Sequence, residues 1–308
     1  MPTPETFEYS PAFREHIVQL HRGKEGWPHY NAYLDAHLGG PDSRLHEHKT
    51  RLVRELEHHC GSLREQRVLD FGCGTGASTV ALAGAAGEVV GFDVDAESAR
   101  IARVRMEEHG LGGRVPILSG DSFDPFAPRL GLFDVVLMNG VVEHIPISVE
   151  GLRKRVLQSA WAAVRPGGHL VINDTPNRLW PFDGHSTQLW FLPWLPAGSE
   201  WAYRRAVKLG RHADSPTSAP GPLGLEQVGA WGATYPELLG YLGGEDEVEC
   251  INLRPGHSER VSYVDAGSPR RQKLEKLLHK TLVPALRMPL TAFAPSLNNL
   301  VLRKRTAE

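Results

Sequence analysis

Cysteine is scarce in this chain: three residues among 308, odd in number and without the spacing of a metal site. This excludes a disulfide scaffold and fits a reducing compartment, so we expect a cytoplasmic protein. No run approaches the roughly 20 apolar residues that a membrane-spanning helix needs. The first residues are neither basic nor apolar, so no secretory signal is expected.

A strong excess of one charge is also missing. Lys and Arg number 34 and Asp and Glu number 36, which gives a formal net charge of -2. Nucleic-acid-binding domains usually carry a basic excess, so we expect a small-molecule partner and no nucleic acid. Apolar residues make up 41% and charged residues 23%, which is ordinary for a globular chain. The length suggests one large domain, or one domain with a sizeable insertion.

Short apolar segments alternate with helical patterns through the middle of the chain. The segments are residues 67–71, 88–93, 115–118, 133–138 and 169–173, and two later ones are 248–253 and 297–302. Such alternation is typical of crossover units, which place helices on both faces of a parallel sheet. We therefore predict an α/β fold with a doubly wound, mostly parallel sheet.

Three regions differ in their patterning. Residues 1–60 look like an N-terminal helical cap, and residues 61–175 with 234–308 look like the sheet domain. Residues 176–233 are rich in Trp, Pro, Gly and Ser and interrupt the alternation. We predict that this segment is an insertion at the carboxyl edge of the sheet, where open α/β folds bind ligands.

A glycine-rich turn follows the first predicted strand, in the sequence Asp70-Phe71-Gly72-Cys73-Gly74-Thr75-Gly76. Glycine permits positive φ and lets a ligand approach the bare backbone, and the next helix offers free N–H groups. Gly72, Gly74 and Ala77 also fit the relaxed dinucleotide fingerprint. However, a carboxylate at Asp70 would repel a pyrophosphate. It suits a ligand with a cationic amino-acid end, such as S-adenosylmethionine.

Two further carboxylates follow the next strands. Asp93 ends the second strand, 21 residues after Gly72, where a carboxylate accepts hydrogen bonds from ribose hydroxyls. Asp121 comes directly after the third strand, where an oxygen can accept a hydrogen bond from the exocyclic amine of adenine. Each of these residues could instead be a turn or cap carboxylate, a common fate of Asp near a strand end.

As a set, these segments resemble the class I S-adenosylmethionine-dependent methyltransferases, in the small-molecule, UbiG-like branch. Residues 68–76 look like the family's first motif and residues 133–145 like its fourth-strand motif. Residues 164–170 resemble the turn before its fifth strand, and residues 234–239 its last helix. The resemblance implies a Rossmann-like, seven-stranded methyltransferase fold with S-adenosylmethionine as cofactor. The implied cofactor residues are Asp70, Gly72, Cys73, Gly74, Gly76, Asp93, Val94, Asp121, Ser122 and Asn139.

Methyl transfer from a sulfonium is an in-line substitution that needs alignment and exclusion of water. It requires neither a metal nor a covalent intermediate, and it requires a base only if the acceptor arrives protonated. His144, after the fourth strand, and His185, beyond the fifth, are the candidate bases, although structural hydrogen bonds are the commoner role. Asp183 could orient His185. The other histidine pairs lack a third ligand at a recognisable spacing, so we expect no metal.

The insertion holds four of the seven tryptophans within 22 residues, Trp180 to Trp201. These rings could line the acceptor pocket under a lid or form a satellite core. Arg178 could hold an acceptor carboxylate. Residues 26–31 could close over the cofactor, although packing is the commoner role. The expected acceptor residues are Asp174, Arg178, Trp180, Trp190 and Tyr30.

The sequence thus predicts a methyltransferase acting on a small molecule, at a hydroxyl or carboxylate oxygen. Transfer to nitrogen or carbon stays open, as do a nicotinamide-dependent reductase, a non-catalytic cofactor-binding subunit and a homodimer. A basic, leucine-rich helix is expected at about residues 269–286. Packing on the domain is favoured over binding to an anionic membrane.

Overall fold

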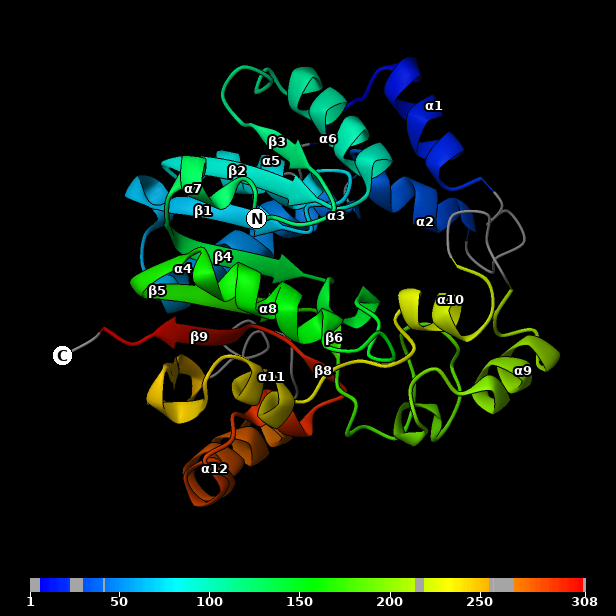
Figure 1. The fold of residues 1–308 in the computed structure, drawn as a ribbon. Coiled ribbons are helices and arrows are strands. Elements are labelled where there is room, and N and C mark those ends of the chain that lie inside the picture. Colours follow the sequence, from blue (N-terminus) through cyan, green and yellow to red (C-terminus); the bar gives the residue numbers. More distant parts are fainter. Residues whose placement is uncertain are drawn as a thin grey trace. The chain divides into compact units, whose positions relative to one another are not determined.

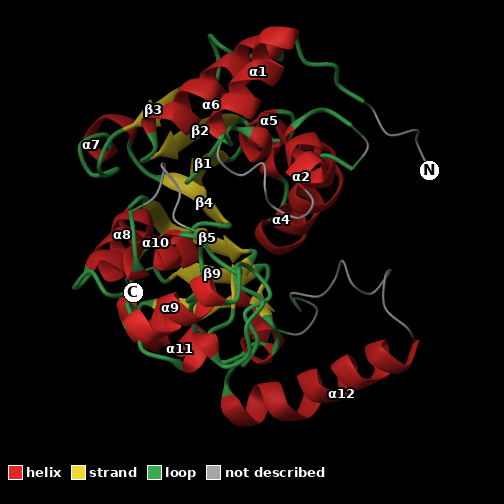
Figure 2. Ribbon diagram, turned by 90° about the vertical axis from the view of Figure 1, so that its right-hand side faces the viewer, coloured by secondary structure: helices red, strands yellow, loops and turns green. Residues whose placement is uncertain are grey.

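The computed structural model describes residues 6–22, 30–40, 42–213, 219–254, 257 and 269–306. The chain divides into two units, Met1–Leu137 and Met138–Glu308, and each is described by itself. Both contain helices and strands (Figures 1 and 2). Of the predicted cap over the cofactor, residues 26–29 lie outside the described part.

Helices form the beginning of the first unit, as predicted. Their bounds are α1 (Pro11–Leu20), α2 (Tyr30–His37), α3 (Arg44–Glu47), the π-helix η1 (His48–Leu52), α4 (Val53–Cys60) and the short 3-10 helix η2 (Leu63–Glu65). The Ser10 hydroxyl accepts a hydrogen bond from the amide of Phe13, which fixes the start of α1. Phe13 and Ile17, one turn apart, form the buried face of this helix.

Four strands of the sheet follow: β1 (Arg67–Phe71), β2 (Glu88–Asp93), β3 (Ile117–Ser119) and β4 (Phe133–Asn139), the last of which ends two residues beyond the first unit. β1 pairs in parallel with β2 and with β4, and β2 pairs in parallel with β3. The connecting helices are α5 (Ala77–Ala83), α6 (Ala96–Glu108) and α7 (Ala127–Leu130). The strands are buried almost throughout, which explains their continuous apolar runs.

The second unit continues with η3 (Val142–His144), α8 (Leu152–Ala162), β5 (Val164–Asn173), β6 (Thr175–Pro176), η4 (Leu192–Trp194), α9 (Glu200–Lys208), α10 (Pro222–Gln227), α11 (Tyr235–Tyr241) and η5 (Gly244–Asp246). It ends with β7 (Val248–Cys250), η6 (Ile251–Leu253), α12 (Pro269–Leu286), η8 (Leu290–Phe293), β8 (Ser296–Leu297) and β9 (Leu300–Lys304). No helix in the described part of the chain is long and apolar enough to cross a membrane.

The predicted seven-stranded sheet is confirmed, with strand order β3-β2-β1-β4-β5-β9-β7. β9 is antiparallel to both β5 and β7. Two strand predictions were too long. Residues 251–253 form the 3-10 helix η6, and the expected strand 297–302 is split because Asn299 adopts a left-handed backbone with φ 49°. Its first part, β8, pairs with β6 in a separate two-stranded sheet.

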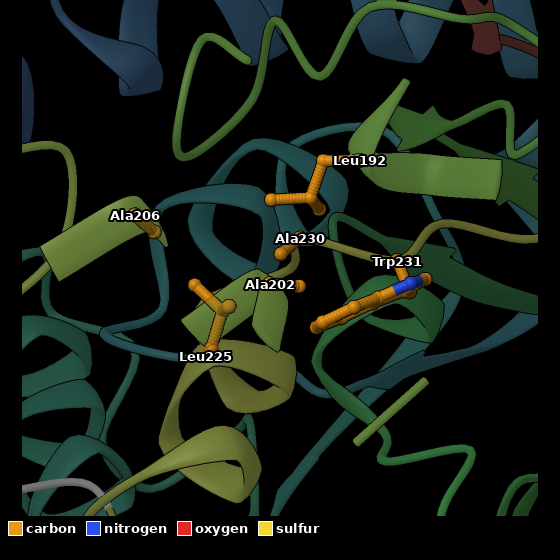
Figure 3. Packing of buried hydrophobic residues seen from close by; sticks show 6 residues of the cluster. All are labelled: Leu192, Ala202, Ala206, Leu225, Ala230 and Trp231. Carbon is orange, nitrogen blue, oxygen red and sulfur yellow. The ribbon is translucent and has the colours of Figure 1, made fainter. Parts of the chain in front are cut away.

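The two ends of the segment predicted as an insertion lie side by side, because Asn177 forms a parallel β-bridge with Ala233. Inside it lies a buried cluster made of Leu192, Ala202, Ala206, Leu225, Ala230 and Trp231 (Figure 3). The indole Nε1 of Trp231 donates a hydrogen bond to the carbonyl of Leu195 at 2.9 Å. The segment therefore has a small core of its own. Its role as a lid and the domain boundaries stay predictions.

Candidate active site

The glycine loop between β1 and α5 is held by backbone hydrogen bonds. The amides of Gly72 and Cys73 both donate to the carbonyl of Phe92, at 2.7 and 3.0 Å. Gly74 has φ 51°, a left-handed conformation that favours glycine, and a Cβ added there would meet nothing within 4 Å. The loop therefore exposes bare backbone at Gly74, the feature that a tightly bound ligand needs.

Asp70 lies behind this loop rather than on its open side. Its side chain is 1% exposed, and its Oδ2 accepts hydrogen bonds from the hydroxyls of Ser78 at 2.7 Å and Thr79 at 2.6 Å. Burial raises the pKa of Asp70 to about 6. These contacts tie the first turn of α5 to β1, so Asp70 supports the loop. Direct contact with the methyl donor stays a prediction.

Asp93 at the end of β2 touches the loop directly. Its Oδ2 accepts a hydrogen bond from the amide of Gly74 at 2.7 Å, and its Oδ1 accepts one from the amide of Asp95 at 2.8 Å. Burial raises the pKa of this carboxyl. Each oxygen keeps acceptor capacity for one more donor. A fixed carboxylate beside open glycine backbone fits the paired ribose hydroxyls of S-adenosylmethionine.

The other predicted cofactor residues differ in exposure. Val94 is 62% exposed, and Asp121 and Ser122 are exposed directly after β3. Cys73 is buried, and its amide and carbonyl are engaged within the protein by Phe92 and Gly76. Asn139 ends β4, and its Oδ1 accepts a hydrogen bond from the side-chain amide of Asn173 at 2.8 Å. A role for each in cofactor binding stays a prediction.

A polar cluster in the second unit joins Glu143, His144 and His185, whose carboxylate and ring-nitrogen atoms lie within 4.8 Å of one another. Glu143 is 0% exposed, and its Oε2 accepts a hydrogen bond from the hydroxyl of Thr175 at 3.1 Å. Among the described residues its Oε1 has no hydrogen-bond partner. Burial, followed by the field of Asp174, raises the pKa of Glu143 to about 8.

The two imidazoles of the cluster have different surroundings. The Nδ1 of His144 lies 2.7 Å from the carbonyl of Gln227, which can only accept. Nδ1 therefore carries a proton and donates it to this carbonyl, and Nε2 lies 3.7 Å from Oε1 of Glu143. Gly229 has φ 88°, and a Cβ there would lie 2.7 Å from Cδ2 of His185. Glycine is needed at this position to leave room for that ring.

Asp183 does not orient the imidazole of His185 as expected. Its Oδ1 accepts hydrogen bonds from the amides of His185 and Ser186, at 3.0 and 3.1 Å. Its Oδ2 accepts from both the amide and the hydroxyl of Thr187. Asp183 is therefore the cap of a turn.

One carboxylate and two imidazoles are also suitable ligands for a divalent cation. Metal ligands usually make a further hydrogen bond to a neighbouring group. Here Nδ1 of His144 donates to a backbone carbonyl, and Glu143 accepts a hydrogen bond from the hydroxyl of Thr175. Both histidines were predicted as candidate bases, but Glu143 was not, and the meeting of His144 with His185 was not foreseen because the two lie 41 residues apart. The available signal was the adjacent Glu143-His144 pair after β4.

The predicted acceptor residues lie on different elements. Arg178 is half-buried, and its Nε donates to the carbonyl of Pro193 at 3.4 Å. Trp180 and Trp190 are 39% and 64% exposed, so neither belongs to the buried core of the insertion. Asp174 is exposed on the second unit, whereas Tyr30 begins α2 in the first. Their role in holding the acceptor stays a prediction.

Comparison with known proteins is consistent with this geometry. Residues 68–168 match a family model described as a methyltransferase domain. The chain is 30% identical over 211 residues to the ubiquinone biosynthesis O-methyltransferase of Bordetella avium strain 197N, covering 66% of this chain and 80% of that protein. The protein of the same name from Bordetella parapertussis strain 12822 is 32% identical over 187 residues, covering 58% and 70%. A solved amino pentose methyltransferase from Micromonospora echinaspora is 25% identical, covering 48% and 56%, with a TM-score of 0.35.

The matching family model and the relatives, together with the seven-stranded sheet, identify an S-adenosylmethionine-dependent methyltransferase. The chain belongs to the class I family of these enzymes, and it acts on a small molecule with S-adenosylmethionine as the methyl donor. Because the chain belongs to this family, the two alternative functions, a nicotinamide-dependent reductase and a non-catalytic subunit, are no longer favoured.

Proposed function

We propose that this enzyme methylates an oxygen of its small-molecule acceptor, and that this oxygen belongs to a hydroxyl group. The observation that carries the proposal is the cluster of Glu143, His144 and His185, with one buried carboxylate oxygen that has no hydrogen-bond partner among the described residues. A hydroxyl must lose its proton during transfer, whereas a carboxylate acceptor needs no base. A preformed proton acceptor therefore favours a hydroxyl.

The proton has a defined destination in this cluster. Because Nδ1 of His144 donates to Gln227, Nε2 is the atom that accepts the hydroxyl proton, and the ring becomes an imidazolium. Once Glu143 is ionised, its carboxylate, 3.7 Å from that nitrogen, stabilises the positive charge. The two groups titrate as a coupled unit, since a charged imidazole lowers the pKa of the carboxyl next to it. Bound S-adenosylmethionine supplies an electrophilic methyl group whose leaving group is a neutral thioether.

The relatives support oxygen as the acceptor atom. Those described above carry the name ubiquinone biosynthesis O-methyltransferase, and their similarity extends over both units of this chain. The exposed aromatic side chains of the insertion, Trp180 and Trp190, support an acceptor that carries a ring or an apolar chain.

The test is a panel of acceptors in matched pairs, each pair differing only in a hydroxyl or an amine, with release of S-adenosylhomocysteine as the readout. We expect turnover on hydroxyl compounds, and a loss of about 100-fold or more in His144→Ala with unchanged cofactor affinity. His58→Ala, an exposed histidine of α4, is the matched control. Turnover on amines alone, or full activity in His144→Ala, would overturn the proposal.

A second way for the same cluster to activate a hydroxyl is to hold a divalent cation that binds the oxygen. The outer hydrogen bonds on His144 and Glu143 favour this candidate. Chelation separates the two. If activity survives the removal of divalent cations, the imidazole itself accepts the proton of the acceptor hydroxyl. Activity that is lost and then restored by an added cation, together with calorimetric binding of that cation, assigns the cluster to the metal.

A further inference from the structure

Arg105 on α6 is a fully buried cation that joins the glycine loop to the N-terminal segment. Its side chain is 0% exposed. The Nε donates a hydrogen bond to the carbonyl of Thr75 at 2.6 Å, one Nη donates to the hydroxyl of Tyr9 at 2.5 Å, and the other donates to the carbonyl of His37 at 2.9 Å. One guanidinium thus connects three separate segments of the first unit.

The partners of this cation are all uncharged. Among the described residues no carboxylate forms an ion pair with Arg105, and its guanidinium carbon lies 4.9 and 4.8 Å from the ring centroids of Tyr9 and Phe13. Burial lowers the pKa of the guanidinium. Burying a cation without a carboxylate partner costs free energy, whereas burying an apolar side chain of similar size does not carry this cost. Stability alone is therefore a poor reason for an arginine here.

The contact with Thr75 places Arg105 next to the cofactor loop. Thr75 precedes Gly76, whose φ is 83°, and a Cβ on Gly76 would lie 3.1 Å from both Ala102 and Met106 of α6. The peptide between Thr75 and Gly76 is therefore fixed by α6 on one side and by the guanidinium on its carbonyl. The preceding residue, Gly74, donates its amide to Asp93.

The other two contacts of Arg105 lie in the N-terminal segment, residues 6–22 and 30–40. Tyr9 precedes α1, and its hydroxyl also lies 3.0 Å from Nε2 of His109. His37 ends α2, and its Nδ1 lies 3.4 Å from the hydroxyl of Thr75. The orientation of the peptide between Thr75 and Gly76 therefore depends on residues of the N-terminal segment.

We propose that Arg105 is a positioning residue for S-adenosylmethionine, which holds the Thr75 carbonyl so that the glycine loop stays in its binding conformation. The N-terminal segment completes this arrangement through Tyr9 and His37. The proposal rests on the assignment of the loop and Asp93 to the cofactor. It gives the N-terminal helices a function in cofactor affinity beyond covering the sheet.

The experiment compares Arg105→Met and Tyr9→Phe with Arg103→Met, an exposed arginine of the same helix. The readouts are the thermal midpoint without ligand, the calorimetric Kd for S-adenosylhomocysteine, and KM for S-adenosylmethionine against kcat. Loss of charge-assisted hydrogen bonds to the loop should weaken binding about tenfold or more in Arg105→Met and several-fold in Tyr9→Phe. The thermal midpoints should stay close to that of the parent protein, kcat at saturating cofactor should change little, and Arg103→Met should be unaffected.

A folded Arg105→Met that binds S-adenosylhomocysteine with the parent Kd would overturn the proposal. If that variant does not fold, Tyr9→Phe decides alone, because its ring still packs and only the hydroxyl is lost. Arg153→Met removes the buried arginine of the second unit and should leave Kd unchanged; an equal loss there would show a general effect of stability. Unchanged affinity in Asp93→Ala would instead show that the cofactor site itself is misassigned.

Discussion

The buried carboxyl of Glu143 should make the stability of the enzyme fall as pH rises. In the unfolded chain this group ionises near its ordinary pKa of 4.5, whereas in the fold burial raises its pKa to about 8. Between these values the unfolded state binds fewer protons than the native state. The free energy of unfolding therefore decreases from about pH 4.5 and levels off near pH 8, where both states are ionised.

The magnitude follows from the same two values. At 1.36 kcal/mol per pKa unit, complete titration costs roughly 5 kcal/mol, of which roughly 3 kcal/mol has been lost by pH 7. Glu143→Gln carries no titrating proton at this position, and its amide can still accept from Thr175. Its stability relative to the parent should therefore be similar near pH 5 and should increase by several kcal/mol towards pH 8.

The assay is thermal or urea unfolding of both proteins at several pH values between 4.5 and 8.5, with chelator present. The exposed Glu200→Gln is the control, and its profile should follow that of the parent protein. Parallel curves for Glu143→Gln and the parent across this range would refute the reasoning. The carboxyl would then be ionised in the fold at neutral pH, although no divalent cation is available to the cluster.

Three further predictions concern single side chains. Asp93→Ala should weaken S-adenosylhomocysteine binding about 100-fold in calorimetry with the fold intact, because the ribose hydroxyls lose their acceptor; an unchanged Kd would contradict the assignment. Trp231→Ala should destabilise the protein by about 3–5 kcal/mol in denaturant unfolding, because the ring is 0% exposed, whereas the exposed Trp190→Ala should change stability by less than about 0.5 kcal/mol. Equal effects would argue against a separate core in the insertion. Gly229→Ala should displace the ring of His185 and lower kcat without changing cofactor affinity; normal turnover would show that the position of this ring does not matter.

The order of strands and helices could be read from the sequence because the parallel strands are buried on both faces. Each then appears as a short apolar run bounded by glycine, as between Arg67 and Gly76. Features decided by one backbone angle could not be read in this way. Residues 297–302 were predicted to form one strand, but Asn299 adopts positive φ and splits it; Asn takes this conformation more often than most residues without being bound to it.

The candidate site was predictable where residues lie at a fixed distance from a strand end, as Asp93 does. It was less predictable where distant segments meet. His185 lies beside Glu143 because the chain turns at Asp183 and because Gly229 leaves room for the ring. Neither feature produces a recognisable pattern in the amino-acid sequence. Asp70 was predicted to favour a cationic ligand end, and the sequence did not show that Ser78 and Thr79 on the next helix donate hydrogen bonds to its carboxyl.

The central claim, transfer of a methyl group to a hydroxyl oxygen, is tested most directly by the chemical environment of the transferred carbon. S-adenosylmethionine labelled with carbon-13 in its methyl group would be incubated with the enzyme and an accepted substrate, and the product examined by NMR. We predict a single labelled methoxy resonance, that of a methyl ether. A labelled methyl ester, or a labelled methyl bonded to nitrogen or carbon, would contradict the account.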